Sequence, residues 1–344
     1  MRYLSIDTAK RISRIGLGTW QFGSREWGYG ADYADKEAAA IVRRALELGV
    51  TLFDTAEIYG FGRSEKILGR ALGDDLPKIF LATKILPVWP IAPVVQQRGV
   101  ASANRLGARK LDLYQVHAPN PAVRDGTIMA GMRALQRTGL VDEVGVSNYS
   151  LRRWRAAEAA LAGLVPGGGA GAWPGRRVLS NQVSYSLAER HPDRDLIPYA
   201  EKKGRIVIAY SPLAQGLLSG KYDAANRPSN RVRAGSALFL AENLERAAPL
   251  INALREIAEA HSATPAQIAL AWVLHSPAVV AIPGASSVAQ LEGNVAAAEI
   301  DLTDEEYRAL SAAADRFRPV TGAAAMTALA RARFEGLKSV LTRA

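Results

Sequence analysis

The stretch KEAAAIVRRALELGVTLFD, residues 36–54, joins a helical pattern to a short apolar run. Four apolar side chains of its first part repeat at helical spacing and share one face: Ile41, Val42, Ala45 and Leu46. The run that follows, residues 50–54, is typical of a buried strand and ends in Asp54. A helix followed by an apolar strand is the repeating unit of parallel β/α proteins, so this stretch predicts a β/α fold.

The same alternation continues along the chain. Seven further apolar runs have the length of buried strands: residues 13–18, 78–84, 111–117, 142–148, 178–185, 205–211 and 279–284. Helical spacing recurs between them, as in residues 125–139, where Ile128, Met132 and Leu135 share a face. Eight such units predict an α/β fold, a closed (β/α)8 TIM barrel. An open doubly wound sheet is the alternative, and it is weakened because no strand precedes a GxGxxG turn with an acid about twenty residues later.

The 344 residues are predicted to form a single domain over residues 1–344, although length alone would also permit two ordinary domains. The barrel core is expected over about residues 10–315, with a tail at residues 316–344. The sequence MTALARARFEGLKSVL, residues 326–341, predicts an extra helix in this tail.

Two irregular segments are expected on opposite faces of the barrel. Residues 165–177, rich in Gly, Pro and Ala, lead into a strand, so they are interpreted as a surface insertion on the face away from the active site. Residues 216–242 follow a strand and belong on the active-site face, where long loops often act as lids. Arg231 and Arg233 of this segment could meet an anionic ligand.

Composition excludes several kinds of site. The chain has no cysteine and four scattered histidines, which rules out disulfides, thiolate zinc sites and cysteine nucleophiles, and we expect no metal. The net charge of +10 comes from dispersed basic residues without a nucleic-acid motif, so no nucleic-acid partner is expected. No apolar run is long enough for a membrane span, and the first residues lack a signal-peptide pattern, so a cytoplasmic location is expected.

Three consecutive strands end in a polar residue. Asp54 ends the second strand, Lys84 the third and His117 the fourth, and Tyr59 follows in a Gly-rich turn. Neighbouring strands lie about 4.8 Å apart, so the three strand ends should lie within roughly 10 Å of one another. Taken singly, each residue is compatible with a structural role, such as an ion pair or ordinary packing. Together they favour a catalytic site at the carboxyl ends of the strands.

The four side chains together could donate a proton to a substrate. A phenol has a pKa of about 10, and a nearby ammonium such as Lys84 would lower the pKa of Tyr59. Asp54 would keep Lys84 charged, and His117 could donate a hydrogen bond to a substrate carbonyl. The result is a proton donor that faces a pocket, as the reduction of a carbonyl requires.

Several motifs extend this pattern. GLGTWQFG (16–23), FDTAEIYGFGRSE (53–65), GVSNYS (145–150), AYSPLAQGLLSGKY (209–222) and IPGASS (282–287) together resemble the aldo-keto reductase superfamily over about residues 10–315. The fourth motif resembles the branch with bacterial reductases and potassium-channel β subunits. The resemblance implies an NADPH-dependent enzyme that reduces an aldehyde or ketone, sugar-like carbonyls included. An NADPH-binding regulatory subunit with little turnover is the alternative, and a barrel enzyme of another class, such as a phosphate-ester isomerase, is a third reading.

The resemblance also implies roles for individual residues. Tyr59 would be the general acid, Lys84 and Asp54 its tuning pair, and His117 the residue that orients the carbonyl. NADPH would lie extended across the barrel mouth, without a Rossmann domain. Its contacts would come from Gly18, Thr19, Trp20, Asp54, Ser147, Asn148, Gln182, Tyr210, Ser211, Pro212, Leu213, Gln215, Gly216, Ile282, Gly284, Ser286, Gln290 and Asn294.

Within that set, Ser147, Asn148 and Gln182 match the residues that bind the carboxamide, and Tyr210 matches the aromatic that stacks on the nicotinamide. The segment from Ser286 reads as a turn into a helix, and helix N-termini bind phosphate. It lacks the Arg or Lys with which many relatives hold the 2′-phosphate, and Gly293 stands where an acid is usual. NADPH is still expected over NADH, and the arginines of residues 216–242 could compensate.

The substrate is expected to be a small carbonyl compound. Trp20, Trp27 and Trp89 fall in loops after the first and third strands and could form an aromatic wall with Tyr59 and His117. Ordinary loop packing is the alternative for each tryptophan. The sequence leaves a monomer and a homo-oligomer equally open.

Overall fold

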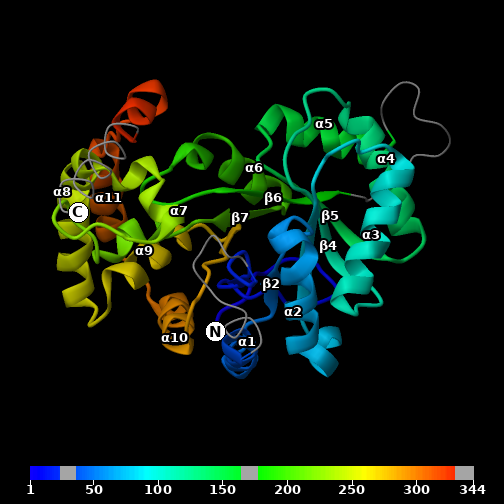
Figure 1. Ribbon diagram of the computed structural model, residues 1–344, viewed down its shortest axis with the longest axis horizontal. Helices are drawn as coiled ribbons and strands as arrows, with labels where there is room; N and C mark the ends of the chain where they lie inside the picture. The colour runs from blue at the N-terminus through cyan, green and yellow to red at the C-terminus, as the bar shows by residue number, and fades with distance from the viewer. Residues whose placement is uncertain (24–35, 164–176, 330–344) are drawn as a thin grey trace, which may run out of the picture.

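Eight parallel strands form one sheet in the order of the sequence, β1 to β8 (Figure 1). This computed structural model describes residues 1–23, 36–163 and 177–329. The strands are β1 (Leu17–Gly18), β2 (Leu52–Asp54), β3 (Phe80–Ile85), β4 (Leu111–Val116), β5 (Val141–Ser147), β6 (Val178–Ser184), β7 (Ile206–Tyr210) and β8 (Val279–Ala281). Each of the eight predicted runs overlaps one of these strands, and β3 and β5 each extend one residue beyond the predicted run.

The sheet closes on itself between its first and last strands. Parallel bridges pair Ile15 with Ala281 and Gly18 with Gly284. A Cβ atom on Gly18 would lie 2.6 Å from the carbonyl oxygen of Ile282, so only glycine lets the two backbones approach here. The predicted (β/α)8 barrel is therefore confirmed, and the open-sheet alternative is wrong.

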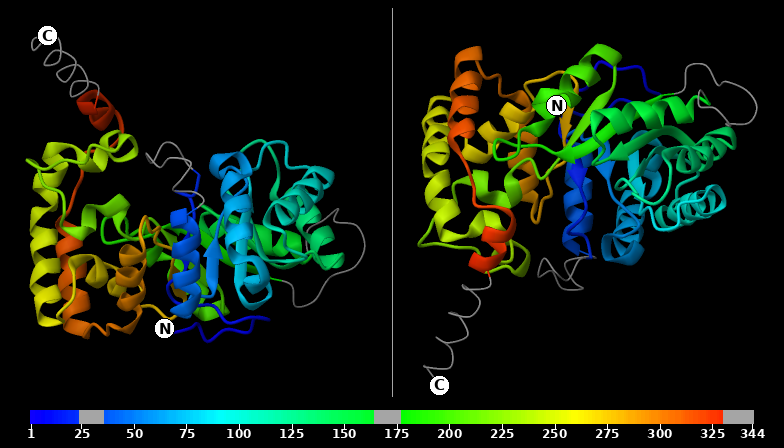
Figure 2. Two further views of the ribbon diagram at one scale, coloured as in Figure 1. Left: turned by 60° about the horizontal axis from the view of Figure 1, so that its bottom comes forward. Right: turned by 90° about the horizontal axis from the view of Figure 1, so that it is seen from above.

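Helices surround the strands (Figures 1 and 2). They are α1 (Ala38–Glu47), α2 (Arg63–Leu72), α3 (Ala92–Leu106), α4 (Asp125–Arg137), α5 (Leu151–Leu161), α6 (Leu196–Lys203), α7 (Arg231–Ala234), α8 (Ala241–Ala260), α9 (Pro265–Val273), α10 (Val288–Ala296) and α11 (Asp304–Arg316). Both helical patterns predicted from the sequence are confirmed, since Ile41 on α1 and Ile128 on α4 are fully buried. Among the described residues, no helix is long and apolar enough to cross a membrane.

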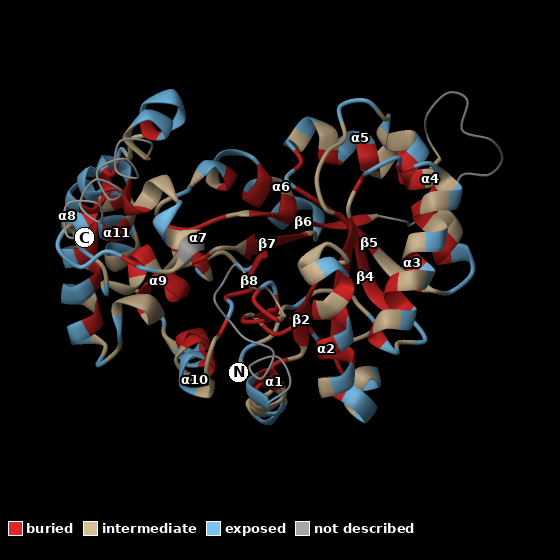
Figure 3. Cartoon of the chain, viewed as in Figure 1, coloured by how far each residue is buried: buried red, intermediate tan, exposed pale blue. Residues whose placement is uncertain are grey.

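The interior of the barrel changes from apolar to polar along the strands. Apolar side chains from most strands meet in one cluster: Ile12, Leu52, Phe80, Ala82, Leu113, Leu179, Ile206, Ile208, Val280 and Ile282. Two residues further along, on the same face by the period of a strand, come Asp54, Lys84 and Gln115, all buried. Figure 3 shows the strands as the most deeply buried part of the fold. The polar end of the interior is thus the place where a site can form.

The tail is fastened to α8. The side chain of Asn243, fully buried, accepts from the backbone nitrogen of Val320 at 2.7 Å and donates to its carbonyl oxygen at 3.1 Å. A helix follows from residue 322 to residue 329, which is earlier than the start predicted at residue 326. The rest of the predicted tail helix and nearly all of the predicted insertion at residues 165–177 lie outside the described residues.

Candidate active site

The end of β3 places a buried ammonium among three oxygen atoms. Lys84 Nζ lies 2.6 Å from Asp54 Oδ1, 2.8 Å from the carbonyl oxygen of Thr55 and 3.3 Å from the hydroxyl oxygen of Tyr59. An ammonium has three protons to donate, so all three find an acceptor. Burial works against the charge of Lys84, but the Asp54 carboxylate and the Tyr59 hydroxyl outweigh it and raise the pKa of Lys84. Lys84 is therefore a cation at neutral pH.

The second oxygen of Asp54 is held from the far side of the barrel. Gln182 Nε2, on β6, donates to Asp54 Oδ2 at 2.8 Å, and Gln115 Nε2, on β4, lies at 3.4 Å. Gln115 also accepts from Ser180 at 3.2 Å. The role of Gln115 was missed in the sequence, although its polar side chain on the same strand face as His117 could have signalled it. Asp54 thus joins four strands at the base of the site.

Tyr59 begins the 3₁₀ turn η3 (Tyr59–Gly62) that follows β2. Its ring stands edge-on to the ring of His117, with centroids 5.7 Å apart, and the ring of Trp20 lies 6.3 Å away on a tilted plane. Burial raises the pKa of Tyr59, and Lys84 offsets only part of this effect. Lys84 lowers the pKa of Tyr59, as predicted, but the net shift is upward, because the cost of burying a phenolate exceeds the attraction of one ammonium that Asp54 already neutralises.

His117 follows β4 and faces the same space. Burial and the charge of Lys84 lower the pKa of His117 to about 3, so its imidazole is neutral at physiological pH. Its Nδ1 is buried and has no hydrogen-bond partner among the described residues. The structure thus brings together all four predicted catalytic residues, Asp54, Tyr59, Lys84 and His117.

A second group of polar residues adjoins His117 at the ends of β5, β6 and β7. Asn148 Nδ2 donates to the carbonyl oxygen of His117 at 3.2 Å and to Ser147 Oγ at 3.1 Å. Ser147 Oγ donates to the backbone of Gln182 at 2.8 Å, and the Tyr210 hydroxyl donates to Asn148 Oδ1 at 2.9 Å. The four residues predicted to hold a nicotinamide therefore form one connected network.

The loop after β7 has an unusual backbone. Left-handed φ angles occur at Ser211 (50°), Ala214 (47°) and Gln215 (58°), and Gly216 follows with 98°. Such strain at residues other than glycine is concentrated at ligand clamps and active sites. The backbone of Gln215 accepts from Arg233 Nε at 2.8 Å, while Gln215 Oε1 is buried without a partner among the described residues. This loop carries the predicted contacts Ser211, Pro212, Leu213, Gln215 and Gly216.

The start of α10 has polar groups but no cation of its own. Gln290 Oε1 accepts from the backbone nitrogen and the hydroxyl of Ser286 at 2.9 and 2.8 Å, and Ser287 caps the helix. Asn294 Nδ2 donates to the carbonyl oxygen of Gly284 at 3.4 Å. The nearby acid Glu292 is paired with Arg44 of α1 at 2.7 Å. Arg44 therefore places a basic side chain against α10, although the segment over residues 282–294 has no Arg or Lys of its own.

Thr19 and the aromatic residues near the mouth of the site differ widely in exposure. Thr19 is fully buried, and its hydroxyl lies 3.0 Å from the backbone oxygen of Asp54, below the mouth of the site. Trp89 is 79% exposed with a left-handed φ of 48°, and Phe61, which sequence reasoning missed, is 92% exposed on the Tyr59 turn. Trp27 lies outside the described residues.

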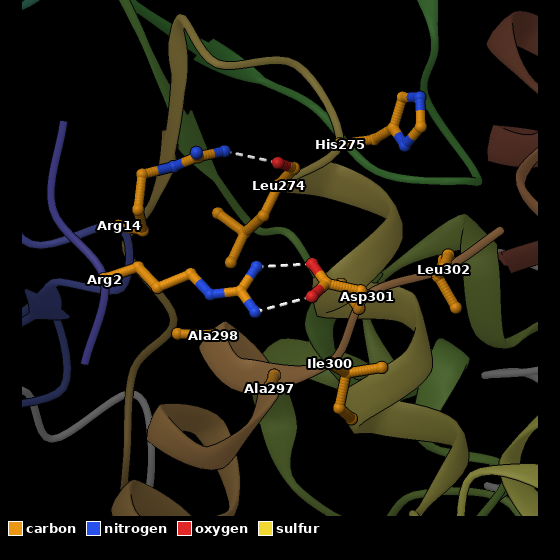
Figure 4. Close-up of a pocket in the computed structure, with 10 residues that line it drawn as sticks. Arg2, Arg14, Leu274, His275, Ala297, Ala298, Ile300, Asp301 and Leu302 are labelled. Atoms are coloured by element: carbon orange, nitrogen blue, oxygen red, sulfur yellow. Dashed lines mark hydrogen bonds and ion pairs between the residues drawn. The ribbon is translucent and has the colours of Figure 1, made fainter. Parts of the chain in front are cut away.

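A pocket of about 150 Å³ lies away from these residues, where β1 and β8 begin (Figure 4). Its two arginines are already engaged: Arg2 is paired with Asp301, and Arg14 donates to the carbonyl oxygens of Leu274 and Ser276. Both cations are thus engaged within the protein, and none of the four predicted catalytic residues lines this pocket.

Comparison with known proteins agrees with this geometry. A sequence model of the aldo/keto reductase family matches residues 14–315. The chain belongs to this family. The predicted aldo-keto reductase resemblance is thereby confirmed, and so is the prediction of an NAD(P)H-dependent oxidoreductase acting on small carbonyl compounds.

Two similar proteins and one similar crystal structure show how much of the chain the similarity covers. The uncharacterized oxidoreductase Rv2298 of Mycobacterium tuberculosis is 56% identical over 333 residues, which cover 96% of this chain and 98% of that protein. The methylglyoxal reductase YeaE of Escherichia coli is 33% identical, with 88% of this chain and 91% of that protein covered. The crystal structure of a Klebsiella pneumoniae aldo-keto reductase in complex with NADPH is 27% identical, with a TM-score of 0.70 and coverage of 94% and 98%.

Proposed function

We propose that the protein is an NADPH-dependent reductase of aldehydes or ketones in which Tyr59 is the general acid. The proposal rests on the position of the Lys84 ammonium, which contacts both the Asp54 carboxylate and the Tyr59 hydroxyl. A cation held 3.3 Å from a phenol stabilises the phenolate that remains after proton transfer. The regulatory-subunit alternative is not favoured by the oxidoreductase names of the relatives.

The residues at the mouth fit a nicotinamide cofactor. Because Asp54 accepts from Gln182 Nε2, the other end of that amide, Oε1, is left to accept from a carboxamide N–H. Ser147 and Asn148 lie beside it, and the ring of Tyr210 would cover the nicotinamide. The strained loop over residues 211–216 and the start of α10 would hold the phosphates and the adenosine. When bound, the cofactor supplies a hydride to the carbonyl carbon of the substrate.

His117 would orient the substrate through one proton. A buried N–H without an acceptor is rarer in proteins than a buried acceptor without a donor, so the orphaned Nδ1 is assigned as the unprotonated nitrogen. The proton then sits on Nε2, which donates a hydrogen bond to the carbonyl oxygen. Because the pKa of His117 is about 3, the imidazole polarises the carbonyl without becoming a competing acid.

Tyr59 would complete the reaction. Its raised pKa keeps the proton on the hydroxyl until the carbonyl oxygen gains negative charge and becomes the stronger base. The proton then passes from Tyr59 Oη to that oxygen, and Lys84 stabilises the phenolate. Trp20, stacked at an angle against Tyr59, would line the substrate side of the site, and Trp89 would extend it.

Replacing the hydroxyl of Tyr59 tests the proposal. In Tyr59→Phe we expect cofactor binding, measured by quenching of tryptophan fluorescence, to stay within about twofold of wild type. Turnover with methylglyoxal or other small aldehydes should fall by about 10²- to 10⁴-fold, the usual contribution of a positioned acid. Turnover equal to that of the wild type would remove Tyr59 from this role.

A further inference from the structure

One arginine fastens the loop that follows β3. Arg98 Nη1, from α3, donates to the carbonyl oxygens of Leu86 at 2.8 Å and Val88 at 3.3 Å. The same guanidinium pairs with both carboxylate oxygens of Glu57, its Nε lying 3.0 Å from Oε2. A planar guanidinium is suited to this double task, because it presents several donors in a fixed geometry.

Glu57 connects that loop to the catalytic residues. It lies two residues before Tyr59, and its backbone nitrogen donates to the carbonyl oxygen of Lys84 at 3.3 Å. Its side chain, only 9% exposed, also accepts from the backbone nitrogen of Leu86 at 2.5 Å. The pair of Glu57 and Arg98 therefore links the Tyr59 turn, the end of β3 and the loop over residues 86–91.

The same loop is held on its other side by the segment after His117. Asn120 Nδ2 donates to the carbonyl oxygen of Pro87 at 2.7 Å, and Arg153 donates to the backbone of Asn120 at 2.7 Å. Within the clamped loop Trp89 keeps a left-handed backbone, a conformation that persists only when surrounding contacts enforce it. The loop exposes apolar surface at Val88 and Trp89, which are 51% and 79% exposed.

We propose that Arg98 is a positioning residue for carbonyl reduction. By bridging Glu57 and the carbonyls of Leu86 and Val88, it holds the loop over residues 86–91 against the turn of Tyr59. It thereby sets where the non-reacting, apolar part of a substrate lies while its carbonyl faces Tyr59. This inference rests on the proposed function of the site, and it assigns the clamp a role in substrate placement that the reacting residues do not have.

The chain supplies a matched control on the same helix. Arg105, also on α3, pairs with the buried carboxylate of Glu65 at 2.5 Å, and its side chain is 24% exposed against 26% for Arg98. Glu65 lies on α2 and also accepts from Thr83 of β3, and Arg105 contacts Ser102 of α3 and lies against Gly62. Unlike Arg98, Arg105 makes no hydrogen bond to the loop over residues 86–91 among the bonds of the described chain. Arg98→Met and Arg105→Met thus remove comparable ion pairs with different neighbours.

Kinetics with a small and a large aldehyde, methylglyoxal and 4-nitrobenzaldehyde, give the first readout. We expect Arg98→Met to lower kcat/KM for the aryl aldehyde by about 10- to 100-fold, in line with the effect of a misplaced binding element, and for methylglyoxal by clearly less. Arg105→Met should stay within about threefold for both substrates, even if both variants lose thermal stability. Arg98→Lys, which keeps the charge but cannot bridge Glu57 and two carbonyls, should be intermediate.

Amide hydrogen exchange gives a second readout that does not depend on turnover. Residues 86–91 should exchange faster in Arg98→Met than in wild type, and at the wild-type rate in Arg105→Met. Equal exchange and equal kinetics in the two arginine variants would overturn the proposal. If Arg98→Met does not fold, Arg98→Lys with the same two readouts decides the question. A wild-type protein that oxidises no NADPH with any carbonyl would overturn the proposed function, whereas the exchange result would still test the clamp.

Discussion

Asp54 shows how one buried carboxylate can organise a site without transferring a proton. One of its oxygens faces the ammonium of Lys84 and the other accepts from Gln182, so it holds a charge on one side and an amide on the other. Removing one partner of such a buried pair leaves an uncompensated charge, which costs about 3–5 kcal/mol. The geometry of the site is therefore tied to the ionised form of Asp54.

His117 leads to a prediction about acid stability. Its pKa falls from an unfolded value of about 6.5 to about 3 in the folded protein, because of burial and the nearby Lys84. The folded state thus binds its proton less readily than the unfolded state, and stability is full above about pH 6.5 and declines as the pH falls towards 3. In His117→Gln, urea unfolding should show a smaller loss of stability between pH 6.5 and 4 than in wild type.

The control for this experiment is an exposed histidine. His191 is 52% exposed beside Glu189, and His191→Gln should reproduce the acid sensitivity of the wild type. An identical pH dependence of unfolding in His117→Gln and wild type would contradict the low pKa of His117.

For individual residues, the sequence predicted the site where polar side chains stood at the ends of strands. Asp54, Lys84 and His117 could be predicted because a parallel barrel brings consecutive strand ends together. The hydrogen bond from Gln115 to Asp54 could not be predicted, since a polar residue in an apolar strand does not reveal its partner. The direction of the Tyr59 pKa was also inaccessible, because it depends on how deeply the phenol is buried.

Among the elements, the loop after β7 and the start of α10 define the proposed cofactor site. The motif AYSPLAQGLLSGKY located the first of these, but left-handed angles at Ser211, Ala214 and Gln215 could not be predicted, since they occur at residues other than glycine. Such angles are enforced by long-range contacts, one of which is the bond from Arg233 to the backbone of Gln215. Sequence motifs therefore locate this loop without giving its shape.

The neutral start of α10 leads to a prediction about cofactor preference. A 2′-phosphate there would meet the hydroxyls of Ser286 and Ser287 and the positive end of the helix dipole. This dipole contributes about 0.3–1 kcal/mol, so NADPH should bind only about two- to fivefold more tightly than NADH. Side-by-side titrations followed by tryptophan fluorescence would measure the ratio.

A matched variant sharpens that titration. Ser286→Arg adds a cation at the start of α10, and it should increase the preference for NADPH without changing the affinity for NADH. A ratio above about 100 in the wild type would show that a cation outside α10 already holds the phosphate.

For the whole molecule, the alternation of helices and strands was sufficient to predict the barrel. The contacts that fasten distant parts of the chain were not predictable, because no local pattern encodes them. Arg2, for example, pairs with Asp301 near the other end of the described chain, and Asn243 holds the backbone of Val320.

Asn243 provides a test of how the tail contributes to stability. Its buried amide makes two hydrogen bonds to Val320 and one to the carbonyl oxygen of Ala237, and Asn243→Ala would leave these backbone groups without this partner. We expect the free energy of unfolding to fall by about 1–3 kcal/mol, measured in urea. Turnover should be unchanged, because Asn243 lies on α8 and contacts none of the proposed site residues.

The comparison variant lies on the same helix. Asn252 is exposed on α8, and Asn252→Ala should change the free energy of unfolding by less than about 0.5 kcal/mol. Equal losses in the two variants would show that the Val320 contacts do not stabilise the fold.

The closure of the barrel has a consequence for folding during synthesis on the ribosome. Ile15 and Gly18 pair with Ala281 and Gly284, so the ring of strands cannot be completed until most of the chain has left the ribosome. Tyr59, Lys84 and His117 emerge long before that moment. Until β8 arrives, the edges of β1 and β7 are open to other chains, and pairing over so long a sequence separation is slow. Nascent chains that stall before residue 279 thus keep two unpaired strand edges, which favours aggregation.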